Sequence, residues 1–107
     1  MQDKILSLLG LAKKAGKLKA GYDVCTDAIR SGQAVSAFAC MDISEKTFKN
    51  LLFEAEKAGI PALRLSASTD MLSYACKIHA GTAVLTDSGF SKAIIDKINE
   101  TSGETAK

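Results

Sequence analysis

The sequence lacks the patterns that mark common catalytic and metal-binding sites. It contains no P-loop, no Gly-x-Gly-x-x-Gly fingerprint and no nucleophile elbow. Its three cysteines form no Cys-x-x-Cys pair, and its single histidine, His79, cannot complete a zinc site with them. No apolar run is long enough to cross a bilayer. These absences predict a protein with no catalytic activity, no cofactor, no metal and no membrane association.

The cysteines also indicate the compartment. Cys25, Cys40 and Cys76 are an odd number at wide spacings, which is typical of buried thiols in a reducing environment. Asp3 and the periodic apolar spacing after it argue against a signal peptide. We therefore expect a cytoplasmic protein.

The remaining polar residues that could act chemically have simpler interpretations. Asp87, in the stretch Thr-Asp-Ser-Gly, is typical of a helix cap rather than a general base. His79 is placed at the end of a predicted helix, where the dipole favours a cation. The other aspartates are scattered, and nothing in their spacing predicts a cluster.

Length and patterning predict one α/β domain. The 107 residues are 47% hydrophobic, enough for a real core. Segments with helical spacing alternate with short apolar runs, and this order predicts a sheet of about four strands between helical layers. We expect residues 1–99 to form the domain and residues 100–107 a frayed polar tail. The predicted strands cover Leu18–Ala20, 35–41, 62–65 and 82–86, with helices over 5–15, 22–32, 45–58, 68–77 and 88–99.

Several end signals support these boundaries. Asp42 and Glu45 form a candidate capping box before the third helix, and Ser68 is a candidate cap for the fourth. Three predicted helices end in a basic residue, an alanine and a glycine, which suits the negative end of the helix dipole and a left-handed cap. These endings are at residues 14–16, 57–59 and 79–81.

Basic residues concentrate near the N-terminus. The net charge is only +2, but residues 1–30 carry six basic and three acidic side chains. Lys17 and Lys19 flank a short strand, and Gly21 then opens a helix whose free amides could hold phosphate. These features favour nucleic acid as the partner. The alternative is that Gly16 is an ordinary helix cap and the lysines an ordinary solvated face.

The chain resembles small bacterial YlxQ-like proteins of the kink-turn RNA-binding ribosomal protein superfamily. The resemblance spans about residues 3–98 and is carried by LLGLAKKAGKL at 8–18, Gly21, AIRSG at 28–32, MDISEKT at 41–47, GIP at 59–61 and the segment 63–72. It implies a three-layer α/β/α sandwich around a four-stranded mixed sheet. It also implies non-catalytic binding to structured RNA, of the kink-turn or ribosomal type, and a possible association with the ribosome.

The resemblance also implies where the RNA would bind. In the family, the second helix begins Gly-x-Asn-Glu-x-x-Lys, and the loop after the third strand adds contacts. Here Gly21 is kept, whereas Asp23, Val24 and Asp27 replace the asparagine, glutamate and lysine. The implied RNA-binding residues are Lys17, Lys19, Gly21, Tyr22, Asp23, Asp27, Ser66, Ala67 and Ser68.

Two alternatives remain open at this point. Tyr22 could stack on an unpaired base, or its ring could pack half-buried over the second helix. The altered motif, with Val24 and Asp27, also fits a protein-interaction or regulatory module of the same fold that no longer binds kink-turn RNA.

Overall fold

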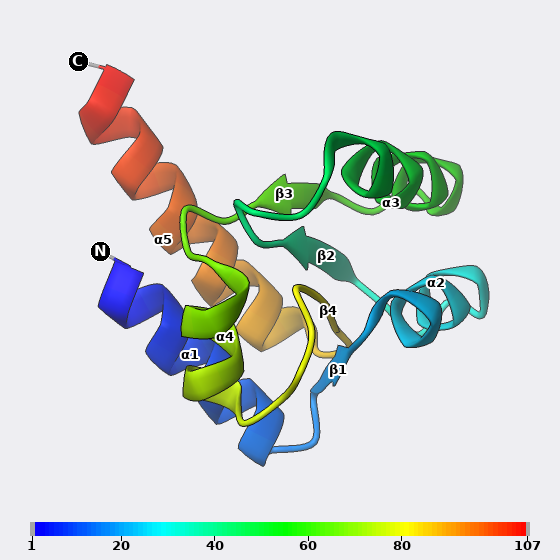
Figure 1. Cartoon of the computed structure of the whole chain (residues 1–107), viewed down its shortest axis with the longest axis horizontal. Helices are drawn as coiled ribbons and strands as arrows, with labels where there is room; N and C mark the ends of the chain where they lie inside the picture. The colour runs from blue at the N-terminus through cyan, green and yellow to red at the C-terminus, as the bar shows by residue number, and fades with distance from the viewer. Residues whose placement is uncertain (1, 107) are drawn as a thin grey trace.

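Two layers of helices enclose a four-stranded sheet (Figure 1). The computed structural model describes the backbone of residues 2–106 and the side chains of residues 4–100. Helices and strands alternate along these residues, as predicted. The elements are α1 Gln2–Lys14, β1 Leu18–Ala20, α2 Tyr22–Arg30, β2 Ser36–Ala39, α3 Glu45–Ala58, β3 Ala62–Arg64, α4 Thr69–Cys76, β4 Thr82–Leu85 and α5 Ser88–Ala106.

The strands are ordered β1-β4-β2-β3. β4 runs antiparallel to both of its neighbours, with Val84 opposite Lys19 of β1 and Ala37 of β2, while β3 is parallel to β2. Therefore β1, β2 and β3 all point the same way, and their carboxyl ends reach the same edge of the sheet. The mixed sheet and the α/β/α layering that the resemblance implied are confirmed.

The core lies in two clusters, one on each face of the sheet. α1, α4 and α5 cover the first cluster, which contains Leu9, Phe38 and Ile94. α2 and α3 cover the second, which contains Cys25 and Leu51. Every residue of the two central strands, β2 and β4, is buried. Burial on both faces explains why the segment around β2 is almost entirely apolar.

One polar pair is buried in this core. The hydroxyls of Ser36 on β2 and Ser91 on α5 lie 2.9 Å apart and form a hydrogen bond. Their exposed fractions are 0% and 6%. This bond accounts for the one polar residue in the buried strand, and it ties α5 to the centre of the sheet.

Most of the predicted caps are confirmed. Gly59 ends α3 in the left-handed conformation, and Gly16, just past α1, also has positive φ. Asp87 accepts a hydrogen bond of 2.9 Å from the amide of Phe90, and so acts as the cap of α5. Ser68 accepts from the amide of Met71 at the start of α4.

The helix ending predicted at 79–81 and the end predicted for α5 are wrong. α4 ends at Cys76, one residue before the predicted Lys77, and Lys77 takes the left-handed cap with φ of 56°, so the segment 79–81 is a connection to β4. α5 continues to Ala106, whereas we expected its end at Asn99. No proline interrupts residues 100–106, so backbone hydrogen bonding continues despite their polarity. Lys107, the last residue of the expected tail, lies outside the described residues.

We predict that the buried serine pair is strongly coupled. Replacing Ser91 alone with alanine leaves the hydroxyl of Ser36 buried without its partner, which should lower the free energy of unfolding by about 1–3 kcal/mol. The double variant Ser36→Ala/Ser91→Ala should lose clearly less than the sum of the two single losses. Urea denaturation of the four proteins measures this, and additive losses would contradict the coupling.

Candidate nucleic-acid interface

Four connections meet at the edge of the sheet where β1, β2 and β3 end. Backbone hydrogen bonds continue past the strands and hold the connections in register. The amide of Gly21 donates to Thr82 over 3.0 Å, that of Cys40 to Gly81 over 2.8 Å, and that of Met41 to Ala67 over 2.9 Å. We call this row of residues 21–23, 41–43, 66–68 and 79–81 the loop edge. From β1 to β3 it spans three inter-strand spacings, about 14 Å.

The start of α2 lies at one end of the loop edge. Gly21 precedes the helix with φ of 101°, a conformation that glycine adopts easily. It provides no side-chain cap, so no protein side chain is bonded to the first amides of α2 in place of a ligand. The expected phosphate seat at this helix start is therefore sterically and chemically open.

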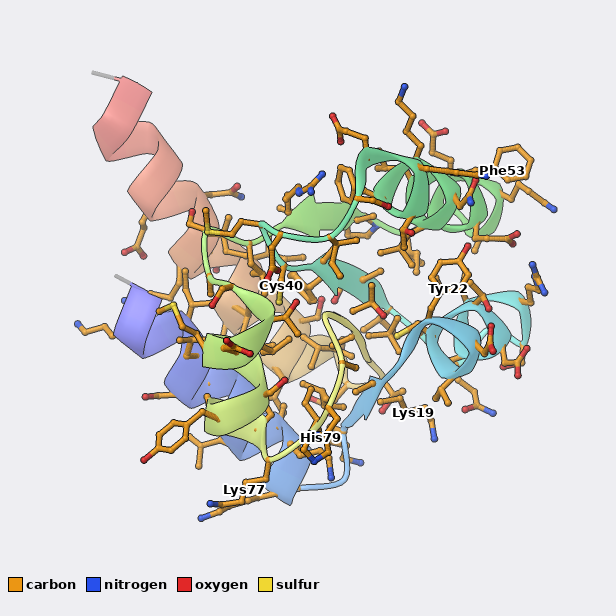
Figure 2. All side chains as sticks on the ribbon, viewed as in Figure 1. Lys19, Tyr22, Cys40, Phe53, Lys77 and His79 are labelled. Carbon is orange, nitrogen blue, oxygen red and sulfur yellow. The ribbon has the colours of Figure 1, made fainter. Side chains whose placement is uncertain are left out.

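Tyr22 does not share the direction of Lys19. Its ring is half-buried and packs against the second core cluster. In Figure 2 it points toward α3, whereas Lys19 points to the opposite side of α2. Tyr22 is half-buried, as the second interpretation expects, and its ring lies on the side of α2 that faces α3.

Two of the motif positions share one surface with Lys19. Lys19, Val24 and Asp27 line a shallow pocket of about 340 Å³ beside the outer face of α2. Helical spacing beside Cys25 and Ala28 would make Val24 an inward residue, but 47% of its surface is exposed. α2 packs on the sheet through Cys25 and Ile29. This contact fixes the rotation of α2 about its own axis, and Val24 then faces solvent. The residues that replace the family's glutamate and lysine are thus positioned where a ligand on α2 would meet them.

The loop between β3 and α4 offers less than its sequence suggested. Ala67 is only 1% exposed and belongs to the first core cluster, so it presents no side chain to a ligand. Ser68 is used as the cap of α4. Ser66 is the exposed member of the three. This loop lies at the opposite end of the loop edge from Gly21. Of its three predicted residues, only Ser66 presents a side chain, its hydroxyl, to a ligand.

Asp42 joins two connections of the loop edge by hydrogen bonds to Thr69. Its carboxylate accepts hydrogen bonds from the amide of Thr69 at 3.0 Å and from the Thr69 hydroxyl at 2.8 Å. The expected capping box of Asp42 with Glu45 is wrong, because Ser44 caps α3 by accepting from the amide of Thr47. The Thr69 hydroxyl is the main reason that the pKa of Asp42 lies below its ordinary value.

Gly81 packs tightly beside the hydrogen bonds between Asp42 and Thr69. A Cβ atom at this position would lie 2.4 Å from Cδ1 of Ile43 and 2.6 Å from the Thr69 hydroxyl oxygen. A side chain here would clash with the Thr69 hydroxyl, which donates a hydrogen bond to Asp42. The connection between α4 and β4 can therefore pack against Ile43 and Thr69 only because Gly81 has no side chain.

Arg64, at the end of β3, fastens the connection between β2 and α3. Its guanidinium donates to the carbonyl oxygens of Met41 (3.2 Å) and Ile43, and it pairs with Glu45 at 2.9 Å. It also lies 4.8 Å from the centroid of the Phe48 ring. These partners engage the charge of Arg64 within the protein, and we assign it a structural role.

The loop edge carries several acids. α2, α3 and α4 all begin here, and each has an acidic residue in its first turn: Asp23, Glu45 and Asp70 respectively. An acid stabilises a helix start through the helix dipole, but at this edge it also opposes a phosphate.

Sequence reasoning missed two candidates beside this edge, a lysine and a histidine. Lys77 and His79 lie in the connection from α4 to β4, and both are exposed. Figure 2 shows them with Lys19 along the same side of the view. They were assigned to a helix end because the ending at 79–81 matched the pattern of the other two.

The C-terminus of α1 adds further lysines near Lys77. Lys14 lines a groove together with Tyr74 of α4, so the two helices bring their last turns together. Burial raises the pKa of the Cys76 thiol, and the charge of Lys13 partly opposes that rise. Lys17 lies at the opposite end of β1 from Gly21, where its carbonyl accepts from the amide of Thr86.

The described residues contain no cluster of histidine, cysteine and acidic side chains that could hold a metal. Cys25, Cys40 and Cys76 are all buried free thiols, as expected. Burial raises the pKa of Cys25 and of Cys40 to about 11, so these thiols are protonated near neutral pH. None of the helices within residues 2–106 has the length and apolar content needed to span a membrane.

Comparison with known proteins places the chain. It is 30% identical over 91 residues to the "RNA-binding protein YlxQ" of Enterococcus faecium, covering 85% of this chain and 87% of that protein. The chain belongs to the YlxQ-like family. No family model matches the sequence.

Solved structures share the fold of this chain. The YlxQ-like chain matches a Bacillus halodurans protein of unknown function with a TM-score of 0.85 and 31% identity, over 90% of this chain and 97% of that one. It matches a 15.5kD RNA-binding protein of Giardia lamblia with a TM-score of 0.74 over 89% of this chain and 84% of that one. The second match, at 18% identity, concerns the fold alone.

We predict that Thr69 sets the titration of Asp42. The pKa of Asp42 is lowered in the folded protein, so its hydrogen bonds with Thr69 stabilise the fold at pH values above the ordinary aspartate pKa. This stabilisation is lost as the pH falls through the lowered pKa. In Thr69→Val, the NMR titration midpoint of the Asp42 carboxyl should rise toward its ordinary value. Glu54 is an internal control, since its pKa is lowered by Arg30 instead. An unchanged Asp42 midpoint would rule out the assignment.

Proposed function

We propose that this YlxQ-like protein binds structured RNA at the loop edge and does not catalyse a reaction on it. The proposal is supported chiefly by the open start of α2, where Gly21 leaves the first amides without a side-chain cap beside Lys19. Its relative in Enterococcus faecium is named an RNA-binding protein. Phosphates would meet the α2 amides and Lys19, with Lys77 and His79 of the connection between α4 and β4 as further contacts.

The RNA would be sharply bent, of the kink-turn or ribosomal type, in keeping with the superfamily. Such an RNA can reach both Gly21 and Ser66, because the two lie at the ends of one edge about 14 Å long. A cytoplasmic, ribosome-associated role fits this partner. Lys17 would contribute at the periphery, since it lies four residues from Gly21, about 13 Å along the strand.

Asp27 and Val24 should weaken standard kink-turn recognition. Asp27 lies beyond the first turn of α2, where the helix dipole favours an acid less, and it shares a pocket with Lys19. Its carboxylate would repel phosphate and offset part of the attraction of that lysine. Val24 has no hydrogen-bonding side chain with which to read a base pair. The protein should therefore prefer an RNA that differs from the standard kink-turn.

A second candidate function is a protein-interaction module. Two large apolar side chains at or next to the loop edge are unusually exposed, Val24 at 47% and Met41 at 57%. Exposed apolar residues among acids suit a protein partner better than an RNA. Purification of partners from cell lysate with and without RNase separates the two functions, since only protein-mediated partners persist after RNase.

We predict that restoring the family residues restores kink-turn binding. The unmodified protein should bind a standard kink-turn weakly or not at all, whereas Asp23→Asn/Val24→Glu/Asp27→Lys should bind measurably. The gain comes from replacing an anion by a cation beside phosphate and from supplying polar groups to the bases. Titrations at fixed low salt, with a straight duplex as the control RNA, test this. Tight binding by the unmodified protein, or no gain in the triple variant, would refute the prediction.

We predict that Lys19 and Lys77 contribute phosphate contacts to whichever structured RNA is bound. Lys19→Gln/Lys77→Gln should bind more weakly, and each lost contact should reduce the slope of log affinity against log salt by roughly 0.7–0.9. Lys92→Gln/Lys97→Gln is a matched control that removes the same charge, because both lysines lie on α5 and pair with Asp96 at 3.5 Å and Glu100 at 3.6 Å. If the control variant loses as much affinity as the double variant, the loop edge is not the RNA-binding surface.

A further inference from the structure

The solvent-facing side of α3 has a composition that packing does not explain. The helix uses Leu51 and Ala55 to pack on the sheet. At helical spacing on the opposite side lie five exposed residues, and in Figure 2 Phe53 of this group points away from the sheet. We call them the outer stripe of α3: Lys46, Lys49, Asn50, Phe53 and Lys57.

The outer stripe is positively charged. It contains three lysines and no acid. Two acids beside it are engaged elsewhere, since Glu45 pairs with Arg64 and Glu54 pairs with Arg30 at 2.8 Å. Exposed Glu56 lies at the margin of the stripe, one helical turn from Phe53. Within residues 4–100, neither Lys46 nor Lys49 forms an ion pair.

An aromatic ring lies within this stripe of lysines. Phe53 is 59% exposed, although burial is the usual reason for a phenylalanine in a folded domain. The ammonium of Lys57 lies 5.1 Å from the centroid of its ring. An exposed ring among cations is the combination that single-stranded nucleic acids bind, because bases stack on the ring while the lysines meet the phosphates.

We propose that the outer stripe of α3 binds a single-stranded segment of RNA, with a base on Phe53 and phosphates on Lys46, Lys49 and Lys57. This inference rests on the proposed function in taking RNA as the partner, but it assigns a second surface. α3 starts beside the loop edge, and the stripe runs about 16 Å from Lys46 to Lys57. A strand that leaves an RNA bound at the loop edge could therefore continue along α3.

Anionic membrane is the other surface that lysines and a phenylalanine could contact. The stripe has one large apolar residue, Phe53, whereas a helix that lies in a membrane interface presents a broad apolar face. Asn50 also adds a hydrogen-bonding amide suited to a base or a ribose. The composition of the stripe therefore favours RNA.

Binding of a fluorescently labelled single-stranded oligoadenylate tests the proposal. Phe53→Leu keeps the apolar volume but removes the ring, and it should weaken binding at least about fivefold, whereas Phe53→Tyr should bind like the unmodified protein. Lys46→Gln/Lys49→Gln/Lys57→Gln should lower the salt slope by up to about 2. The matched control, Lys4→Gln/Lys92→Gln/Lys97→Gln, removes the same charge from α1 and α5 and should have a smaller effect.

The outcomes also distinguish this surface from the loop edge. A structured RNA without single-stranded ends should bind the α3 variants normally and the Lys19→Gln/Lys77→Gln variant weakly. If Lys19→Gln/Lys77→Gln binds the structured RNA normally while the α3 variants still lose oligoadenylate affinity, the proposed function is refuted and the α3 proposal is retained. Oligoadenylate affinities that are equal in Phe53→Leu and the unmodified protein would overturn the α3 proposal. So would α3 variants that lose affinity for phosphatidylserine vesicles while keeping affinity for oligoadenylate.

Discussion

Burial of β2 and β4 on both faces is the constraint on which the rest of this structure depends. Two strands buried on both faces need helices above and below, and short connections then fix how those helices can be joined. With β4 antiparallel between β1 and β2, the carboxyl ends of the three parallel strands meet at one edge. The starts of α2, α3 and α4 follow from this arrangement, and so does the surface that we assign to RNA.

That surface must satisfy two opposing electrostatic demands. Each of the three helix starts is more stable with an acid in its first turn, and each has one. The same carboxylates repel a polyanion that approaches the edge. The proposed phosphate contacts of Lys19 and Lys77 therefore lie at the flanks of this edge. Such an arrangement would make binding selective, because a ligand gains only if its phosphates avoid the acids and reach the lysines.

Local patterns predicted the elements well, because apolar periodicity and caps depend on residues close in sequence. The caps at Ser68 and Asp87 are examples, and their partners lie three residues away. The errors came from partners that are distant in sequence. Asp42 looked like a cap of α3, but it bonds to Thr69, 27 residues later. No local rule distinguishes those two partners.

The predicted site was limited in the same way. The family pattern identified the start of α2 and the loop after β3, and both do lie on one edge. It did not reveal that Ala67 is buried, that Val24 faces solvent or that Tyr22 is held against α3. Those facts depend on how far α2 is rotated about its axis and on how the loop packs on the core. Both are set by tertiary contacts.

The short outer strands have a consequence for solubility. An open sheet leaves two unpaired backbone rims, here on β1 and β3, and such rims can recruit strands from other molecules. Both strands are only three residues long, and each carries a cation, Lys19 in the middle of β1 and Arg64 at the end of β3. Short length and charge both discourage strand addition. Lys19 thus protects the protein against aggregation independently of any ligand it binds.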